Sequence, residues 1–257
     1  MTSLFISHGS PMLALEDEPT ARFLRQLSSQ FPKPKAIIVA SAHWETDVPM
    51  ITGSTQPETI HDFSGFPKQL YELRYPAPGD PALTARVAQL LSEAGYPAKI
   101  DPTRGFDHGV WNPLLLMYPQ ADIPVIELSV QPKRDARWHY QIGKALAPLS
   151  DEDILIIGTG NLTHNLREAF KGHHTETPAW VTAFAEWVAE QIKQNNIENL
   201  LNWQTLAPYA HENHPTPEHF LPFFTALGAG GGAVAQHLHQ DTVLGVLAMD
   251  SYAFDMS

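Results

Sequence analysis

The chain has 257 residues and a formal net charge of −12, and it contains 13 histidines but no cysteine. The negative charge disfavours binding to nucleic acids or anionic membranes, because both carry negative phosphates. The lack of cysteine excludes disulfides, thiolate metal ligands, iron–sulfur clusters and cysteine nucleophiles. No apolar run reaches the roughly 18 residues of a membrane span, and the first residues lack the pattern of a secretory signal, so we expect a cytoplasmic protein.

The first half of the chain alternates predicted strands and helices. We expect strands over 3–7 and 35–41, and helices over about 20–30 and 81–94. The β-branched run 35–41 is typical of a central strand that is buried on both faces. Asp80 and Pro81 mark the start of the second helix, and Gly95 marks its end.

The second half continues the same alternation. The predicted helices are 111–117, 136–149, 178–194 and one that begins at Thr216 and Pro217, and the predicted strands are 124–130, 153–158 and 243–249. This order favours an α/β fold with a mostly parallel or mixed central sheet and helices on both faces. Without repeats or low-complexity segments, the whole chain, 1–257, is expected to form a single domain.

Three common signatures fail in their structural context. The glycine-rich segment 228–233 follows a predicted helix rather than a strand, so it is not expected to bind a dinucleotide. Gly158 and Gly160 lack the lysine of a phosphate-binding loop and are expected to form a tight turn. His211 and His214 are one residue too close for a zinc-peptidase helix.

The histidines are the residues that point to chemistry. His8, His43 and His164 each lie at or just past the end of a predicted strand. Ligands bind at that edge of an open α/β sheet. His108 lies in a glycine-flanked turn, and His219 is expected in the first turn of the helix that begins at Thr216. A shared metal site is therefore expected at this edge.

Without cysteine, imidazoles and perhaps one carboxylate would suit Fe(II), Mn(II) or Zn(II). The remaining histidines lack such a context and are expected at the surface: His139, His173, His174, His237 and His239. The residue types alone lead no further than a histidine-rich metal site at the carboxyl edge of an α/β sheet.

Seven short segments, taken together and in this order, resemble a known family. They are 7–12 (SHGSPM), 41–44 (SAHW), 60–63 (IHDF), 75–79 (YPAPG), 105–109 (GFDHG), 164–167 (HNLR) and 215–219 (PTPEH). The resemblance is to the DOPA-type extradiol dioxygenases of the class III ring-cleavage family, which are related to the catalytic subunit of protocatechuate 4,5-dioxygenase.

The resemblance implies one divalent metal ion per chain, with Fe(II) expected for activity and Zn(II) as an alternative bound species. His8, His43 and His219 would be ligands. Glu218 is one position, or about 100°, away from His219 on a helix, so we expect His219 rather than Glu218 to face the metal. His164 would act as acid and base, or as a fourth ligand.

The resemblance also implies the rest of the site. His108 would hydrogen-bond the substrate or dioxygen, and His61 and Ser10 are expected to contact the substrate. The expected reaction opens a catechol such as L-DOPA with O₂, and the expected partners are these small molecules, with the protein a monomer or small homo-oligomer. Two alternatives remain open from the sequence: a zinc-dependent hydrolase on the same histidines, or a non-catalytic metal-binding interaction protein.

Overall fold

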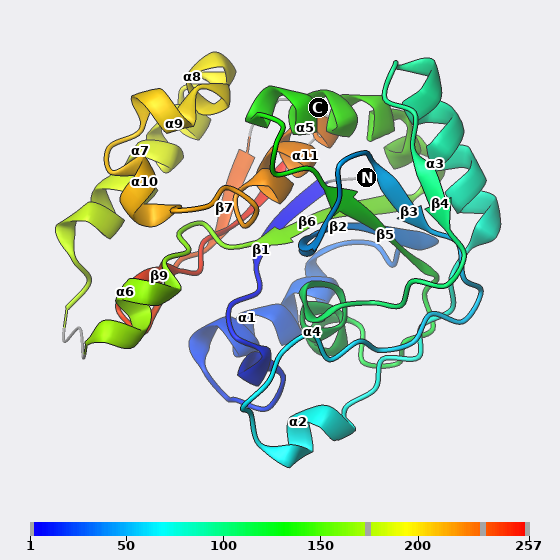
Figure 1. Cartoon of the computed structure of the whole chain (residues 1–257), viewed down its shortest axis with the longest axis horizontal. Helices are drawn as coiled ribbons and strands as arrows, with labels where there is room; N and C mark the ends of the chain where they lie inside the picture. Colours follow the sequence, from blue (N-terminus) through cyan, green and yellow to red (C-terminus); the bar gives the residue numbers. More distant parts are fainter. Residues whose placement is uncertain (1–2, 173–175, 232–234, 255–257) are drawn as a thin grey trace.

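The computed structural model describes residues 3–172, 176–231 and 235–254. Its centre is an eight-stranded mixed sheet with the strand order β4-β3-β5-β2-β6-β1-β10-β7 (Figure 1). The strands of this sheet are β1 (Ser3–Ser7), β2 (Ala36–Glu45), β3 (Met50–Thr52), β4 (Lys99–Asp101), β5 (Val125–Val130), β6 (Ile154–Gly160), β7 (Ala235–His239) and β10 (Ser251–Phe254).

Four parallel strands, β5, β2, β6 and β1, form the middle of the sheet. Their mostly apolar sequences, which contain many isoleucines and valines, suit burial on both faces. The register aligns Ser7 of β1 with Gly160 of β6, and Ser41 of β2 with Thr159 of β6. The carboxyl ends of these strands therefore meet at one edge, where ligands bind in open α/β sheets.

Helices cover both faces of the sheet. Their bounds are α1 (Pro19–Leu27), α2 (Lys68–Glu72), α3 (Pro81–Glu93), α4 (His108–Met117), α5 (Ala136–Leu146), α6 (Leu166–Lys171), α7 (Ala179–Lys193), α8 (Ile197–Leu201), α9 (Trp203–Leu206), α10 (Ala210–Asn213) and α11 (Leu221–Ala229). In Figure 1, α1 and α4 lie on one side of the sheet and α3, α5 and α11 on the other.

Alternation along the strands divides the core between these layers. Ile37 and Val39 of β2 belong to the apolar cluster that includes α1 and α4. Ile38 and Ala40 belong to the cluster that includes α3 and α5. The predicted fold class, an α/β sheet with helices on both faces, is confirmed.

Two predicted elements were wrong in their bounds or type. The helix expected from Thr216 begins at Leu221, because residues 217–220 form a turn in which the Phe220 amide donates to the Pro217 carbonyl. The strand expected over 243–249 is a hairpin of β8 (Thr242–Val243) and β9 (Leu247–Ala248). Leu244 and Gly245 between them have φ of 52° and 73°, which breaks the extended chain.

Gly158 and Gly160 do not form the expected tight turn, because both belong to β6. Their role is close packing. A Cβ on Gly158 would lie 2.1 Å from the Pro222 carbonyl oxygen, and one on Gly160 would lie 2.0 Å from the His219 carbonyl oxygen. The glycines thus let the segment that carries His219 approach the end of the central strand.

Within the described part of the chain, no helix combines the length and apolar character needed to cross a membrane.

Candidate metal centre

Five histidines converge at the carboxyl edge of the sheet, each from a different element. His8 directly follows β1, and His43 lies in β2 where the register with β5 shifts between Ser41 and Glu45. His108 is the first residue of α4. The other two come from the connection between β6 and α6 (His164) and from the turn before α11 (His219).

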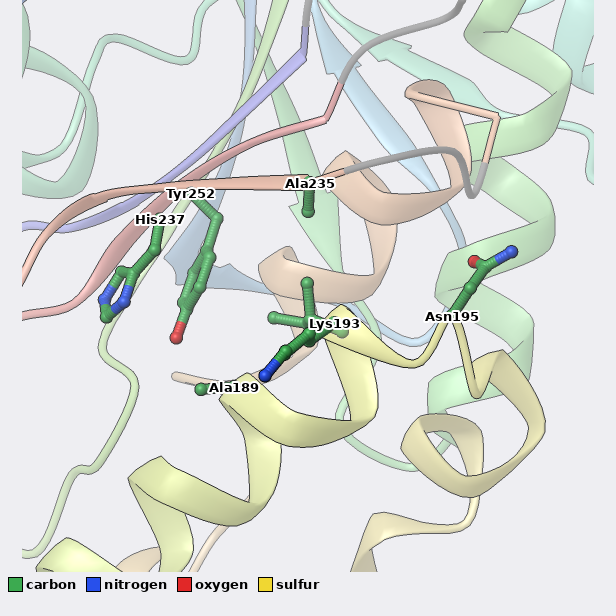
Figure 2. A pocket seen from close by; sticks show the side chains of 7 residues that line it. Ala189, Lys193, Asn195, Ala235, His237 and Tyr252 are labelled. Atoms are coloured by element: carbon green, nitrogen blue, oxygen red, sulfur yellow. The ribbon is translucent and has the colours of Figure 1, made fainter.

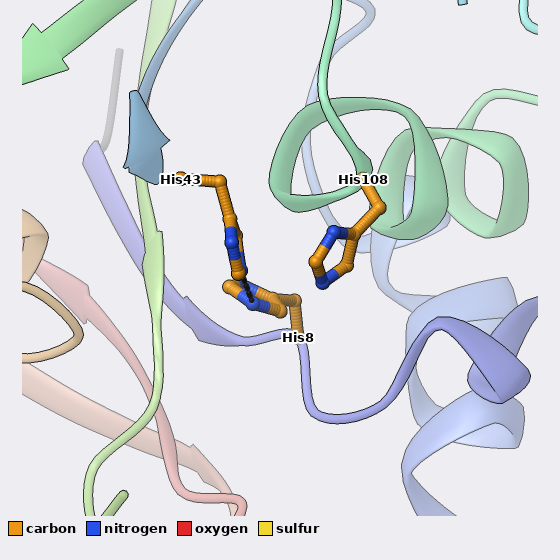
Figure 3. Close-up of side chains that lie close together, drawn as sticks. All are labelled: His8, His43 and His108. Atoms are coloured by element: carbon orange, nitrogen blue, oxygen red, sulfur yellow. Dashed lines mark hydrogen bonds between the residues drawn. The ribbon is translucent and has the colours of Figure 1, made fainter. Parts of the chain in front are cut away.

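The ring nitrogens of three of them face one another. Figure 3 shows His8, His43 and His108 directed toward a common point. One ring nitrogen from each lies within 4.8 Å of the other two, and the Nε2 atoms of His8 and His43 are 2.9 Å apart. Two nitrogens bound at about 2.1 Å to one ion in a right-angle arrangement lie about 3 Å apart, so this spacing fits a metal centre.

His219 joins this group to His164. The His219 ring centroid is 4.9 Å from that of His43 and 5.7 Å from that of His8. The His164 ring stacks on His219 at a centroid distance of 3.4 Å. All five predicted histidines therefore form one cluster.

The cluster is electrostatically suited to a cation. Burial lowers the pKa of His8 and His219 well below the usual value, and neighbouring histidines add to the effect. Burial likewise lowers the pKa of His43 to about 4 and that of His164 to about 3. These imidazoles are neutral at pH 7, and neutral imidazole is the form that binds metals.

Asp62 orients two members of the cluster. Its carboxylate accepts hydrogen bonds from the His108 Nδ1 and the His108 backbone amide, each at 2.9 Å, and lies 3.5 Å from the His43 Nδ1. Burial opposes ionisation of Asp62, but the hydrogen bonds and charge of His108 outweigh it and lower the pKa of Asp62 to about 2. With Nδ1 engaged, His108 presents Nε2 to the centre.

Asp62 was missed by the sequence interpretation, which selected its neighbour His61. A carboxylate that holds a metal-site histidine leaves no local periodic signal in a sequence. The only available sign was its place in the segment 60–63, one of those that carry the family resemblance.

A second aspartate fixes the backbone around the centre. Asp107 is the N-cap of α4 and accepts from the Gly109 amide at 3.0 Å and from the Ser41 hydroxyl at 2.7 Å. The same hydroxyl accepts from the His43 amide at 3.2 Å. Asp107 thereby ties the end of β2 to the start of α4, and so sets the spacing between His43 and His108.

Glu218 and His219 both lie near the centre. The His219 Nδ1 is 3.0 Å from a Glu218 carboxylate oxygen, so a hydrogen bond to Glu218 leaves the His219 Nε2 free. Ligand atoms of His164, Glu218 and His219 also lie within 4.8 Å of one another. The donor set of this region is thus imidazole with one carboxylate, which suits iron, manganese or zinc.

A cavity of about 380 Å³ opens over the cluster. Its size is within the usual range for small-molecule sites. It is lined by Gly9, Ser10, Pro11, His43, Phe63, Ser64, Phe66, His108, Asn161, His164, Leu166, Phe170, His219, Leu244 and Leu247. Four histidines supply most of its polar lining, and aromatic and aliphatic side chains supply the apolar part.

A family model described as the catalytic LigB subunit of aromatic ring-opening dioxygenase matches residues 2–251. The chain belongs to this family.

Similar proteins support the same conclusion. A Beta vulgaris protein named 4,5-DOPA dioxygenase extradiol is 43% identical over 257 residues, which cover 98% of this chain and 96% of the relative. A protein of the same name from Escherichia coli (strain K12) is 43% identical over 90% of this chain and 86% of its own length. The crystal structure of an uncharacterized Escherichia coli K12 protein is similar with a TM-score of 0.84, at 38% identity over 99% of both chains.

The expected enzyme class is confirmed: this LigB-family chain is an extradiol ring-opening dioxygenase. The family membership therefore favours a dioxygenase over the two alternatives, a hydrolase and a non-catalytic interaction protein. In this LigB-family chain, the histidine cluster described above is the possible metal site.

Of the two residues expected to contact the substrate, Ser10 lines the cavity and His61 does not. Ser10 lines the cavity, and its hydroxyl accepts from the Met12 amide. His61 is not among the lining residues of this cavity. Its Nε2 lies 3.2 Å from the Leu73 carbonyl oxygen, and its ring packs near Trp111 at 5.7 Å.

The prediction that His139 lies at the surface was wrong. His139 is buried, its Nε2 accepts from the Gln131 amide at 3.0 Å, and its Nδ1 lies 2.9 Å from the Asp135 carbonyl oxygen. His237 is exposed as expected, and His239 is half-buried. The other two histidines expected at the surface, His173 and His174, lie outside the described residues.

Proposed function

We propose that the enzyme opens the ring of a catechol such as L-DOPA beside its two hydroxyls, using O₂ and one divalent ion per chain. The substrate assignment is supported by the relatives named 4,5-DOPA dioxygenase extradiol. The observation that carries it is the convergence of five histidines, four of which line a cavity that also has aromatic and aliphatic lining. The proposed partners are therefore small molecules, the catechol and O₂.

We assign His8, His43 and His219 as the residues that would hold the ion, with Glu218 orienting His219 through its Nδ1. The neutral state of these imidazoles and the close Nε2 atoms of His8 and His43 support this assignment. A bound ferrous ion would supply the redox chemistry that couples oxidation of the catechol to reduction of O₂.

His164 and His108 are assigned to proton transfer and hydrogen bonding. His164 lines the cavity and is neutral, so its ring can accept a proton from a catechol hydroxyl and return it later. His108 is held through Nδ1 by Asp62, which leaves Nε2 to hydrogen-bond a substrate oxygen. Ser10 is placed to contact the substrate at the cavity wall.

The apolar side chains that line the cavity suit the flat ring of a catechol. Phe63, Phe66 and Leu247 offer surfaces on which an aromatic ring can pack, and Leu166 and Phe170 of α6 are exposed side chains that also line the cavity. Exclusion of water by these side chains strengthens the hydrogen bonds made inside.

The decisive experiment is an oxygen-electrode assay after anaerobic loading with Fe(II). We expect L-DOPA or another catechol to consume O₂ and to give a yellow ring-opened semialdehyde. The zinc-loaded protein is the control and should be inactive, because Zn(II) has no accessible redox change. Turnover by the zinc form, or catechol loss without O₂ uptake, would contradict the proposal.

A further inference from the structure

A second cavity, of about 630 Å³, lies between the end of α7 and the strands β7 and β10 (Figure 2). β7 is an edge strand of the sheet. None of the residues that line this cavity lines the one over the histidine cluster. The cavity is therefore separate from the proposed catechol site.

The most informative side chain in this second cavity is Tyr252. The residue is 1% exposed, and its phenol oxygen has no hydrogen-bond partner among the residues that the structure describes. Burial raises the pKa of Tyr252, so the hydroxyl stays protonated and can donate. A buried hydroxyl without a partner is unfavourable, so an acceptor that reaches it would stabilise the folded protein. Figure 2 shows its oxygen at the end of the ring nearest α7.

A cation lines the same cavity as this hydroxyl. Lys193 is exposed in the last turn of α7 and lines the cavity. Lys35 and Lys171 pair with acidic side chains, whereas Lys193 has no ion pair within the described ranges. The helix dipole favours a lysine at this position, but it does not account for the buried phenol. Together the two groups offer one hydrogen-bond donor and one positive charge.

The rest of the cavity is lined by apolar side chains, by His237 and by the exposed Asn195. Ala189, Ile192 and Ala235 form an apolar floor, and the last two pack against the core. His237 stacks on Tyr252 at a centroid distance of 4.5 Å, and its Nε2 pairs with the buried Asp250 at 2.9 Å. The ring of Tyr252 is thereby held in place from the other side.

We propose that this cavity binds a small organic carboxylate. The carboxylate accepts a hydrogen bond from the Tyr252 hydroxyl and pairs with the Lys193 ammonium, while the carbon skeleton of the ligand lies on the apolar floor. A carboxylate satisfies both groups at once, because it combines acceptor oxygens with a negative charge.

The test is a ¹⁹F NMR titration of the full chain with 4-fluorobenzoate, and with neutral 4-fluorobenzyl alcohol for comparison. We expect the benzoate to bind and the alcohol to bind at least about tenfold more weakly, since the charge-assisted bonds are lost. Tyr252→Phe and Lys193→Met should each weaken benzoate binding by about tenfold. Lys99→Met, an exposed lysine on β4 at the opposite end of the sheet, should leave it unchanged.

Two results would overturn the proposal. If the alcohol binds as tightly as the benzoate, the cavity does not select for a carboxylate. If both cavity variants bind benzoate with wild-type affinity, the benzoate binds elsewhere, for example at the histidine cluster. Thermal unfolding without ligand tests the premise that the Tyr252 hydroxyl has no hydrogen-bond partner. Tyr252→Phe should be as stable as the wild type or more stable, because it deletes an unpaired hydroxyl. A lower Tm would mean that the hydroxyl already has a partner.

Discussion

Glu218 and His219 are adjacent residues that compete for one role at the metal centre. Because the His219 Nδ1 lies 3.0 Å from Glu218, we assign the carboxylate to orienting the imidazole rather than to the ion. His219→Ala should therefore lose the metal, as should His8→Ala, whereas Glu218→Ala should weaken metal binding by only about 10–100-fold. Elemental analysis after Fe(II) loading and dialysis measures the difference.

His164→Gln is the matched control in that experiment. It keeps a polar side chain of similar size but cannot titrate, so we expect it to retain iron while catechol turnover falls by about 10²–10⁴-fold. Iron loss equal to that of His8→Ala would make His164 a ligand. Metal loss in Glu218→Ala but not in His219→Ala would reverse the assignment of the third ligand.

Asp62 acts on the centre through His108 and, more distantly, through His43. Asp62→Asn keeps the shape and one acceptor oxygen but removes the charge that orients both rings. We expect kcat or metal affinity to fall by about 10–100-fold, as for other residues that hold metal-site histidines. Steady-state kinetics with metal analysis measures this, and Asp47→Asn, an exposed pair with Lys133, is the control. Equal activity in both variants would show that His108 needs no such support.

At the level of elements, the strands that were predicted are the ones whose sequence is buried on both faces. β1, β2, β5 and β6 are mostly apolar and buried, and such segments have few other interpretations in an α/β chain. His8, His43 and His164, expected at or just past the ends of such strands, could be placed for the same reason, whereas His108 was recognised from its glycine-flanked segment.

The elements that were missed depend on contacts between distant segments. β3 and β4 have three residues each, and β7 and β10 pair antiparallel beside β1, so no run of residues marks them. The role of Asp62 and the burial of His139 were missed for the same reason, because each depends on a hydrogen-bond partner that the neighbouring sequence does not indicate.

The contact between α5 and α11 gives a prediction at this scale. A Cβ on Gly143 of α5 would lie 2.1 Å from the Thr225 carbonyl oxygen of α11. Alanine is intrinsically favoured over glycine within a helix, yet here Gly143→Ala should lower the free energy of unfolding by about 1–3 kcal/mol through overpacking. Urea unfolding measures it. Gly172→Ala is the control and should be neutral, because none of the described residues beyond its chain neighbours has an atom within 4 Å of the new Cβ. A stabilised Gly143→Ala would show that the two helices can separate freely.

The whole molecule carries an unusual number of buried neutral histidines. Burial lowers the pKa of His139 and His214 to about 4, in addition to the histidines of the centre. Between this range and the usual pKa of about 6.5, the unfolded chain binds more protons than the folded one, so stability rises with pH. The stabilisation is complete above about pH 6.5 and is lost as the pH falls.

We therefore expect the metal-free protein to unfold in weak acid, with a midpoint between about pH 4 and 6. Tryptophan fluorescence follows the transition, and the slope of the unfolding free energy against pH counts the protons taken up. An unfolding free energy that is constant from pH 7.5 to 5 would contradict the burial of these histidines in their neutral form.

The position of β1 has a consequence for how the protein is made. β1 is synthesised before the other strands of this sheet, yet it lies between β6 and β10, which follow it in the chain by about 150 and 250 residues. His8, directly after β1, meets His219 only after a further 211 residues have been translated. A nascent chain thus cannot assemble the five-histidine centre, and translation arrested before β10 would leave one side of β1 open to pairing with other chains.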